Sequence, residues 1–164
     1  MNESSATLWT TPLHSIQGIL VFLSSLYVGG NTVIPRVGVL DVSQFWTICE
    51  ADKVSWMSMP ANQVSEVYQY TKSNSPTVSS LDFVRSCPGF LPKESISGME
   101  SVFKTSVLES YGPPEASGFA TGNLETERKA GTFGKPVAVS AVLPSNAAGV
   151  AGEIASVIVV DSVS

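Results

Sequence analysis

The sequence carries little charge, and it has few of the residues that build metal centres or disulfide frameworks. Charged residues make up 14% of its 164 residues, against roughly 25% in an ordinary soluble domain. The formal net charge of −5 is spread without a basic run, which argues against nucleic acids and anionic membrane surfaces as partners. Two cysteines, Cys49 and Cys87, and one histidine exclude a disulfide framework and a clustered Cys/His zinc site.

The first 49 residues are especially poor in charge, with only Glu3, Arg36 and Asp41. Residues 13–28 are mostly apolar, but polar side chains interrupt them, and a membrane-spanning helix needs about 20 apolar residues. A signal peptide would begin with a basic stretch, which residues 1–3 lack. We therefore expect a buried helix here, no membrane span, and a protein that is not secreted and keeps both thiols free.

Helical and extended periodicities alternate along the chain. Helical spacing predicts helices over 12–28, over 42–49 with Asp41 as the cap, around 64–68, and from Pro92 to 103. Short β-branched or apolar runs predict strands over 31–39, 54–59, 81–84 and 106–110, and the polar run 71–80 predicts a loop. This alternation is typical of βαβ units, so we expect an α/β fold with a parallel sheet.

The pattern changes after Glu115. Gly, Ser, Thr and Asn dominate up to Gly131, and strands are expected over 137–143 and 154–160. We therefore expect two parts: a parallel-sheet α/β part over 1–118, and a small antiparallel β appendage over 119–164.

Three of the predicted strands end in unusual segments, at 59–61, 86–91 and 111–115. Ligands of open parallel sheets bind beyond the carboxyl ends of the strands. Glycines there let a planar ligand approach the backbone, Tyr111 offers a stacking face, and Glu115 offers a carboxylate for a hard cation such as Mg²⁺. The same segments are also compatible with ordinary strand-to-helix turns, which use Gly and Pro anyway.

Five segments, in order, resemble the adenylate-forming superfamily of acyl-CoA synthetases, peptide-synthetase adenylation domains and luciferases. Residues 12–18 resemble its Pro-Leu-Phe-His-x-x-Gly segment, 83–91 its adenine-side segment, and 108–116 its Tyr-Gly-x-Thr-Glu signature. Residues 131–136 and 152–154 resemble its Gly-x-x-Gly-x-Pro and Gly-Glu-Ile strands. The chain most resembles the branch that contains oxalate–CoA ligase and related peroxisomal synthetases, because that branch favours Arg-Ser-Cys before the adenine turn. Phe45, Trp46 and Trp56 also fit that branch.

The resemblance implies a reaction in which a carboxylate attacks the α-phosphate of ATP, with Mg²⁺, to give an acyl-adenylate that passes its acyl group to a thiol, commonly coenzyme A. It implies a small carboxylic acid, ATP and the remaining N- and C-terminal parts of the enzyme as partners, and a cytoplasmic or peroxisomal location. It assigns the adenine site to Ser86, Cys87, Pro88, Gly89, Phe90, Tyr111 and Gly112, the metal to Glu115, and the wall of the acyl pocket to His14, Ser15 and Gly18. It assigns no catalytic residue within the chain.

The chain departs from the family pattern at several points. The phosphate loop ending in Pro-Lys and the catalytic lysine of the C-terminal domain have no counterpart in it. Pro114 replaces the threonine of the signature, and Pro113 and Pro114 remove two backbone N–H donors. Ser15, not His14, aligns with the histidine of the family. We therefore expect an incomplete or diverged ligase segment that forms no acyl-adenylate by itself.

Two alternatives stay open on these residues. One is a non-catalytic remnant that acts as an interaction or nucleotide-binding module, and recovery of the phosphate loop and the lysine in flanking sequence would argue against it. The other is an unrelated flavodoxin-like domain, which the strands of the tail disfavour. In each case the weakly charged first 49 residues predict that the isolated chain aggregates or dimerises.

Overall fold

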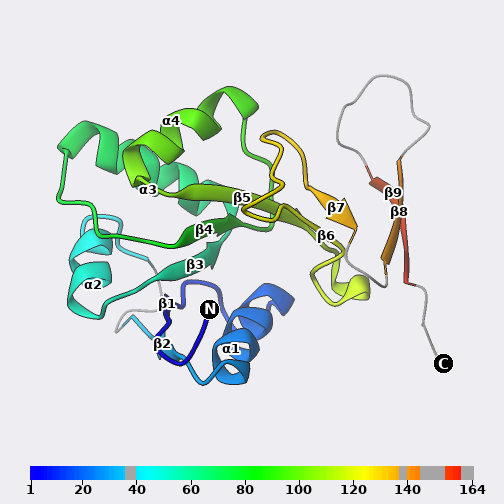
Figure 1. The fold of residues 1–164 in the computed structure, drawn as a ribbon, viewed down its shortest axis with the longest axis horizontal. Coiled ribbons are helices and arrows are strands. Elements are labelled where there is room, and N and C mark those ends of the chain that lie inside the picture. The colour runs from blue at the N-terminus through cyan, green and yellow to red at the C-terminus, as the bar shows by residue number, and fades with distance from the viewer. Residues whose placement is uncertain (36–39, 137–139, 145–153, 160–164) are drawn as a thin grey trace.

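The computed structural model describes residues 1–35, 40–136, 140–144 and 154–159, and it shows a mixed α/β fold. Its main sheet has seven strands in the order β2-β1-β3-β4-β5-β6-β7 (Figure 1). The parallel strands are β1 (Ala6–Leu8), β2 (Asn31–Val33), β3 (Trp56–Met59), β4 (Phe83–Ser86) and β5 (Ser106–Tyr111). The short strands β6 (Thr121–Gly122) and β7 (Lys135–Pro136) extend the sheet in antiparallel fashion beyond β5.

A second sheet pairs β8 (Ser140–Pro144) with β9 (Ile154–Val159) in antiparallel orientation. The predicted parallel sheet and the predicted antiparallel pair at the end of the chain are therefore confirmed. The outer ends of the predicted strands, at 36–39, 137–139 and 160, lie outside the described residues.

The helices cover both faces of the main sheet. They are α1 (Ile16–Tyr27), α2 (Phe45–Ala51), α3 (Ala61–Asn74) and α4 (Lys93–Phe103), with one 3-10 turn, η1 (Pro114–Ala116). Figure 1 shows α3 and α4 above the sheet and α1 below it. No helix in the described part of the chain has the length and apolarity needed to cross a bilayer.

The larger core lies between the sheet and α2, α3 and α4. Its largest fully buried side chains include Leu8, Phe45, Met57, Met59, Leu91 and Phe103. The Trp46 ring packs edge-on against Phe45, with 4.8 Å between centroids, and tilted against Phe103 at 5.8 Å. Apolar burial of this kind supplies most of the stability of a sheet of short strands.

The segment predicted as the loop 71–80 begins inside a helix, because α3 continues to Asn74. Thr71 is buried, and its hydroxyl donates to the Val67 carbonyl (2.6 Å) and accepts from the Trp46 indole N–H (2.7 Å). The hydroxyl of Thr71 therefore provides the hydrogen-bond acceptor for the buried indole N–H of Trp46. Composition alone therefore gave the wrong element for residues 71–74, whereas residues 75–80 form the predicted loop.

Two helix starts also differ from the prediction. Residues 12–15 form a turn in which the Ser15 N–H donates to the Pro12 carbonyl (3.0 Å), so α1 begins only at Ile16. Asp41 does not cap α2, because its carboxylate accepts from the amide (2.9 Å) and the hydroxyl (2.7 Å) of Ser43 within a local turn. Such Asx turns compete with helix capping.

Helix α1 is not the fully buried helix that its composition predicts. Val21 is buried, but Leu23, Leu26 and Tyr27 are 52%, 56% and 92% exposed. With Ile19, these side chains follow the spacing of one helix face. We call this set, Ile19, Leu23, Leu26 and Tyr27, the α1 stripe.

Candidate site at the carboxyl edge of the sheet

The carboxyl ends of β3, β4 and β5 lie side by side, as the parallel order predicted. Met59 is the register partner of Ser86, and the Cys87 N–H donates to the Met59 carbonyl (3.0 Å). The Ala61 N–H donates to the Pro88 carbonyl (2.9 Å), which ties the turn after β4 to the start of α3. The unusual segments that follow the three strands therefore form one edge.

The turn after β4 combines buried and exposed residues. Ser86 and Cys87 are buried, whereas Pro88, Gly89 and Phe90 are exposed. The Cys87–Pro88 peptide bond is cis, and Gly89 has a φ of +106°, which favours glycine. Burial raises the pKa of the Cys87 thiol, so Cys87 packs as a small neutral side chain and is not poised as a nucleophile.

Three aromatic rings lie along this edge and form what we call the aromatic ledge: Phe90, Tyr111 and Phe133. The centroids of Tyr111 and Phe133 are 5.6 Å apart, and those of Phe90 and Phe133 are 6.2 Å apart. Phe90 is exposed and Tyr111 is partly exposed. The ledge offers the faces that a planar base needs for offset stacking. Sequence reasoning missed Phe133, although it lies inside the 131–136 segment that carried part of the resemblance.

The turn after β5 carries the remaining residues predicted for the site. Gly112 packs directly on the backbone of 118–119, and the Ala120 N–H donates to the Tyr111 carbonyl (2.8 Å). Glu115 lies exposed on η1. Among the described residues no three His, Cys, Asp or Glu side chains converge as a metal site. Glu115 could therefore hold Mg²⁺ only together with phosphate oxygens and water, which is how Mg²⁺ usually binds.

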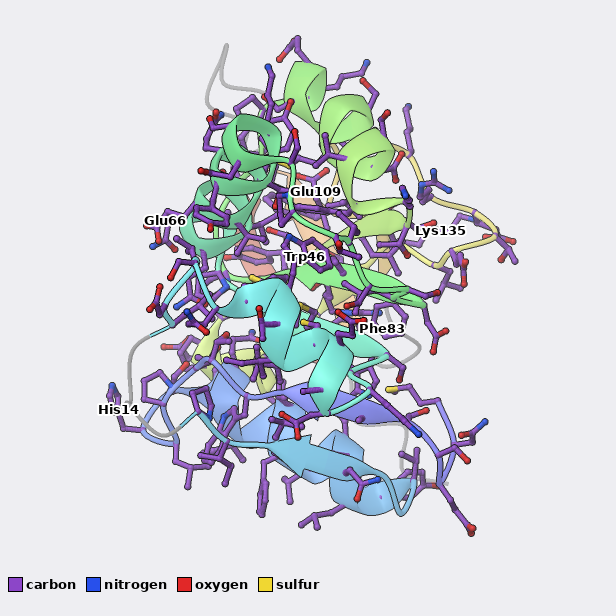
Figure 2. The ribbon with its side chains drawn as sticks, turned by 90° about the vertical axis from the view of Figure 1, so that its left-hand side faces the viewer. His14, Trp46, Glu66, Phe83, Glu109 and Lys135 are labelled. Atoms are coloured by element: carbon purple, nitrogen blue, oxygen red, sulfur yellow. The ribbon has the colours of Figure 1, made fainter. Side chains whose placement is uncertain are left out.

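Beneath this edge lies a buried carboxyl group, that of Glu109 on β5, which is 1% exposed (Figure 2). Its Oε2 accepts from the Gly131 N–H (2.9 Å), whereas its Oε1 has no partner among the described residues. Burial raises the pKa of Glu109, and the amides of Gly131 and Leu91 oppose that shift. Glu109 thus anchors the loop that carries Phe133 to the sheet.

We expect Glu109→Gln to make the protein more stable at neutral pH relative to the wild type. The native carboxyl keeps its proton to a higher pH than the unfolded one, whose ordinary pKa is 4.5. The contribution of Glu109 to the free energy of unfolding is therefore fully present below pH 4.5 and is lost as the pH rises through the native pKa of this carboxyl. Urea unfolding from pH 4 to 8 should show the advantage of the variant growing with pH. The same advantage in Glu66→Gln, on the exposed side of α3, or none in Glu109→Gln, would contradict this role.

On the face of the sheet opposite α3 and α4, a cavity of about 310 Å³ lies under α1. Its walls are mainly apolar, and they include Leu20, Val21, Trp56, Phe83, Phe119 and, as the one charged side chain, Arg85. The Gln17 side-chain amide donates to the Gly118 carbonyl (2.5 Å) and joins α1 to the turn after η1. We call this space the α1 cavity.

The residues assigned to the acyl pocket do not line the α1 cavity. His14 is exposed at the periphery of the molecule (Figure 2). Gly18 is buried, and a Cβ there would lie 2.3 Å from the Pro12 carbonyl oxygen. Gly18 therefore lets the 12–15 turn pack on α1, and Ser15 stands at the start of the helix. Their assignment to an acyl pocket stays a prediction.

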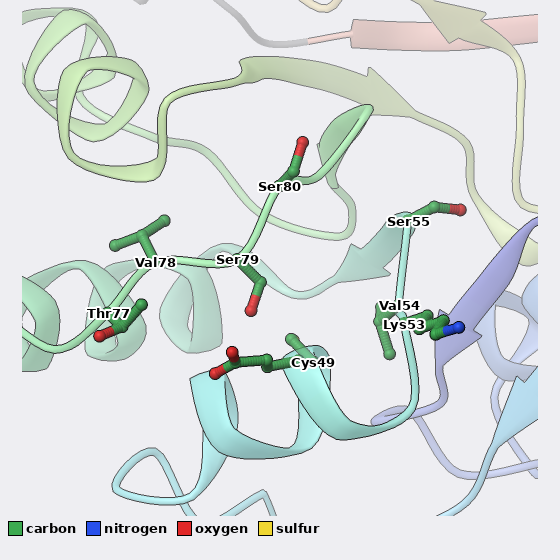
Figure 3. A pocket seen from close by; sticks show the side chains of 9 residues that line it. Cys49, Lys53, Val54, Ser55, Thr77, Val78, Ser79 and Ser80 are labelled. Atoms are coloured by element: carbon green, nitrogen blue, oxygen red, sulfur yellow. The ribbon is translucent and has the colours of Figure 1, made fainter.

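A further pocket, of about 340 Å³, lies at the opposite, amino edge of the sheet, between α2 and residues 77–80 (Figure 3). It is lined by Cys49, Glu50 and Lys53 among others. Burial, together with the charge of Asp52, raises the pKa of Cys49 to about 12. Its thiol is therefore protonated at neutral pH and is not poised as a nucleophile.

The sheet is mostly parallel, and glycine-bearing turns and the aromatic ledge lie at its carboxyl edge. This arrangement is typical of α/β proteins that bind ligands at that edge. The chain belongs to the AMP-binding enzyme family, which matches it over residues 1–155. The family resemblance drawn from its five segments is thereby confirmed.

Curated relatives are CoA ligases. The chain is 30% identical over 142 residues to "Probable CoA ligase CCL9" of Humulus lupulus, a match that covers 84% of this chain and 27% of the relative. It is 29% identical to the "Oxalate--CoA ligase" of Arabidopsis thaliana, with 84% and 28% covered. The chain therefore spans about a quarter of the length of these relatives.

Solved structures with the same fold are acyl-CoA synthetases. The N-terminal domain of FACL13 from Mycobacterium tuberculosis matches with a TM-score of 0.76 at 16% identity, covering 94% of this chain and 40% of that one. The O-succinylbenzoate coenzyme A synthetase of Bacillus subtilis, solved in complex with ATP and magnesium, matches with a TM-score of 0.73 at 19% identity, covering 94% and 33%. At these identities the similarity shows the fold.

Proposed function

We propose that this chain supplies the adenine-binding edge and the acid pocket of an ATP-dependent carboxylate–CoA ligase. The single observation that carries the proposal is the aromatic ledge, which stands beside the Gly112 turn at the carboxyl edge of the parallel sheet. Family membership and CoA-ligase relatives support the reaction class. The alternative, a non-catalytic nucleotide-binding module, shares the same edge and differs only in turnover.

In the proposed reaction, a carboxylate oxygen of the acid forms a bond to the α-phosphorus of ATP, and pyrophosphate leaves. The thiol of coenzyme A then attacks the acyl carbon, gives up its proton, and AMP leaves. Mg²⁺, where bound, neutralises phosphate charge. Within this chain, Tyr111 and Phe90 present faces for the adenine, and the turn at Gly89 gives the base access to the backbone. Glu115 would supply a carboxylate ligand to the metal, with phosphate oxygens and water as the other ligands.

We expect Tyr111→Ala to weaken AMP binding by about tenfold or more, because stacking of a base on an aromatic side chain contributes roughly 1–3 kcal/mol. Isothermal titration of the 164-residue polypeptide with AMP measures the change. Tyr27→Ala is the matched control, since Tyr27 is a highly exposed tyrosine on α1, on the other face of the sheet. Equal affinities of the wild type and Tyr111→Ala for AMP would contradict a nucleotide site at this edge.

The same polypeptide is expected to bind AMP without releasing pyrophosphate from ATP and an acid. Pro113 and Pro114 open η1, so this turn lacks two N–H donors and the hydroxyl that the family signature provides. Losing one such contact costs on the order of 10²–10³ in rate. A pyrophosphate assay over short and long acids, with and without coenzyme A, is the measurement. Turnover that depends on Glu115 would favour a complete site and contradict the expectation.

A further inference from the structure

The segment between β6 and β7 is a loop that Asn123 closes at its base. Asn123 is buried, its side-chain amide donates to the Thr132 carbonyl (2.5 Å), and its side-chain oxygen accepts from the Lys129 N–H (2.9 Å). Its backbone N–H donates to the Glu109 carbonyl (3.0 Å), which ties the loop to β5. Figure 1 shows the loop beside β5, ahead of β7. We call residues 124–134 the 131 loop.

The buried carboxyl of Glu109 ties the 131 loop to the sheet a second time. Its Oε2 accepts from the Gly131 N–H (2.9 Å), two residues before Phe133. Gly131 has a φ of +75°, and a Cβ there would lie 2.8 Å from the Cβ of Lys93, so the loop also packs on the start of α4. Phe133 contacts both other rings of the aromatic ledge. The bond from Gly131 to Glu109 therefore helps to set the position of the third ring.

The Glu109 carboxyl lies where a negative charge is costly. Glu109 is 1% exposed, and its Oε1 has no hydrogen-bond partner among the described residues. The hydroxyl of Ser86, its register partner on β4, is buried and lacks a partner in the same part of the chain. Neither salt bridge of the described residues involves Glu109. An ionised Glu109 would therefore be a buried charge with neither a paired cation nor a full set of hydrogen bonds.

The other titratable and charged groups on the packed elements are exposed, neutral or on the other face of the sheet. Arg85 on β4 lines the α1 cavity, across the sheet from Glu109. Burial raises the pKa of the Cys87 thiol, which therefore stays neutral where a carboxyl titrates. Tyr111 on β5 is partly exposed. The remaining groups, at the start of α4 and in the 131 loop, are exposed to water, which screens them: Lys93, Glu94, Glu125, Glu127, Arg128 and Lys129.

We propose that Glu109 positions the nucleotide site through its charge: the protonated carboxyl keeps the 131 loop and Phe133 on the aromatic ledge, and loss of the proton to water loosens the loop and lowers the affinity for an adenine base. This inference rests on the proposed function, in which the ledge binds the base. The protonated carboxyl still accepts from the Gly131 N–H, whereas the ionised carboxyl gains hydration when the loop moves away. Burial raises the pKa of Glu109 above its ordinary value of 4.5, so the change falls at a higher pH than for an exposed carboxyl.

The test is a titration of the 164-residue polypeptide with adenosine between pH 5 and pH 8, followed by NMR. Adenosine does not change its charge in this range, whereas the phosphate of AMP does. We expect the affinity to fall about threefold or more as the pH rises, because the apparent affinity scales with the fraction of protein in the binding conformation. An affinity that is constant, or that rises with pH, would overturn the proposal.

Glu109→Gln assigns the pH dependence to this carboxyl. The glutamine keeps an oxygen that accepts from the Gly131 N–H but has no proton that titrates, so its affinity for adenosine should stay at the wild-type value of pH 5. Glu100→Gln is the matched control, since Glu100 also accepts a backbone N–H, from Val107 (3.0 Å), and pairs with Arg128 of the 131 loop at the surface. It should keep the wild-type slope. A slope that persists in Glu109→Gln, or disappears in Glu100→Gln, would contradict the proposal.

The amide signal of Gly131 follows the same proton without a variant or a ligand. It should shift with pH in one step, at the midpoint of the change in adenosine affinity, and a different midpoint would overturn the proposal. The same signal separates this inference from the proposed function. Adenosine binding that does not follow the Gly131 step overturns the role of Glu109 alone. A Gly131 step without adenosine binding at any pH overturns the nucleotide site, and this inference with it.

Discussion

Gly112→Ala is expected to destabilise the protein by about 3 kcal/mol and to abolish AMP binding. A Cβ at this position would lie 2.1 Å from the Phe119 nitrogen and 2.2 Å from the Gly118 carbonyl carbon. Both neighbours are backbone atoms, so the turn between β5 and β6 must move as a whole. That movement would displace Tyr111 from the aromatic ledge. Denaturant unfolding and AMP titration measure the two effects.

Gly98→Ala is the matched control for this substitution. Its Cβ would lie 2.7 Å from the Tyr68 hydroxyl, which is the far end of a side chain and can shift. Alanine also gains about 0.5–1 kcal/mol over glycine inside a helix such as α4. We therefore expect little net change in stability and unchanged AMP binding. A Gly112→Ala variant as stable as Gly98→Ala would contradict the close packing of the Gly112 turn.

Exchanging Leu23 and Leu26 for glutamine is expected to shift the isolated polypeptide from self-associated to monomeric. The α1 stripe places these side chains in water beside Tyr27, and α1 contains no charged residue. Burying a leucine contributes about 1.5–3 kcal/mol, so each exchange should weaken self-association by tenfold or more. Sedimentation velocity over a dilution series gives the monomer fraction.

Ile34→Gln provides the control, because Ile34 is 62% exposed but follows β2 and lies outside the α1 stripe. We expect it to leave self-association unchanged. Monomeric wild type at micromolar concentration, or equal effects of both sets of exchanges, would contradict an interface on α1.

The sequence predicted the sheet well because its signals are local. The run at Trp56 and the run at Phe83 are short, apolar and flanked by helical spacing, so their parallel pairing followed from the βαβ pattern. Strand β1 was missed because Ala6–Leu8 is too short to show a periodicity, although all three residues are buried. Its place between β2 and β3 depends on long-range pairing that no local window contains.

The sequence likewise predicted one part of the candidate site and missed another. The position of Tyr111 and Glu115 at the carboxyl edge follows from strand direction alone. Phe133 reaches Tyr111 because Glu109 and Asn123 hold the 131 loop through hydrogen bonds, and the bond from Gly131 to Glu109 joins distant residues. The environment of Arg85 was equally hidden, since alternation along β4 shows that its side chain faces away from Val84 but not that a cavity lies there.

The central claim is that the carboxyl edge of the sheet, and not the pocket at its amino edge, binds the nucleotide. An NMR titration of the isotopically labelled 164-residue polypeptide with AMP tests it directly. We predict the largest amide shifts at Gly89, Gly112 and Gly131, next to the aromatic ledge, and unchanged signals at Cys49 and Ser79, which line the amino-edge pocket. Shifts confined to Cys49 and Ser79, or no shifts at millimolar AMP, would contradict the assignment of this edge as the nucleotide site.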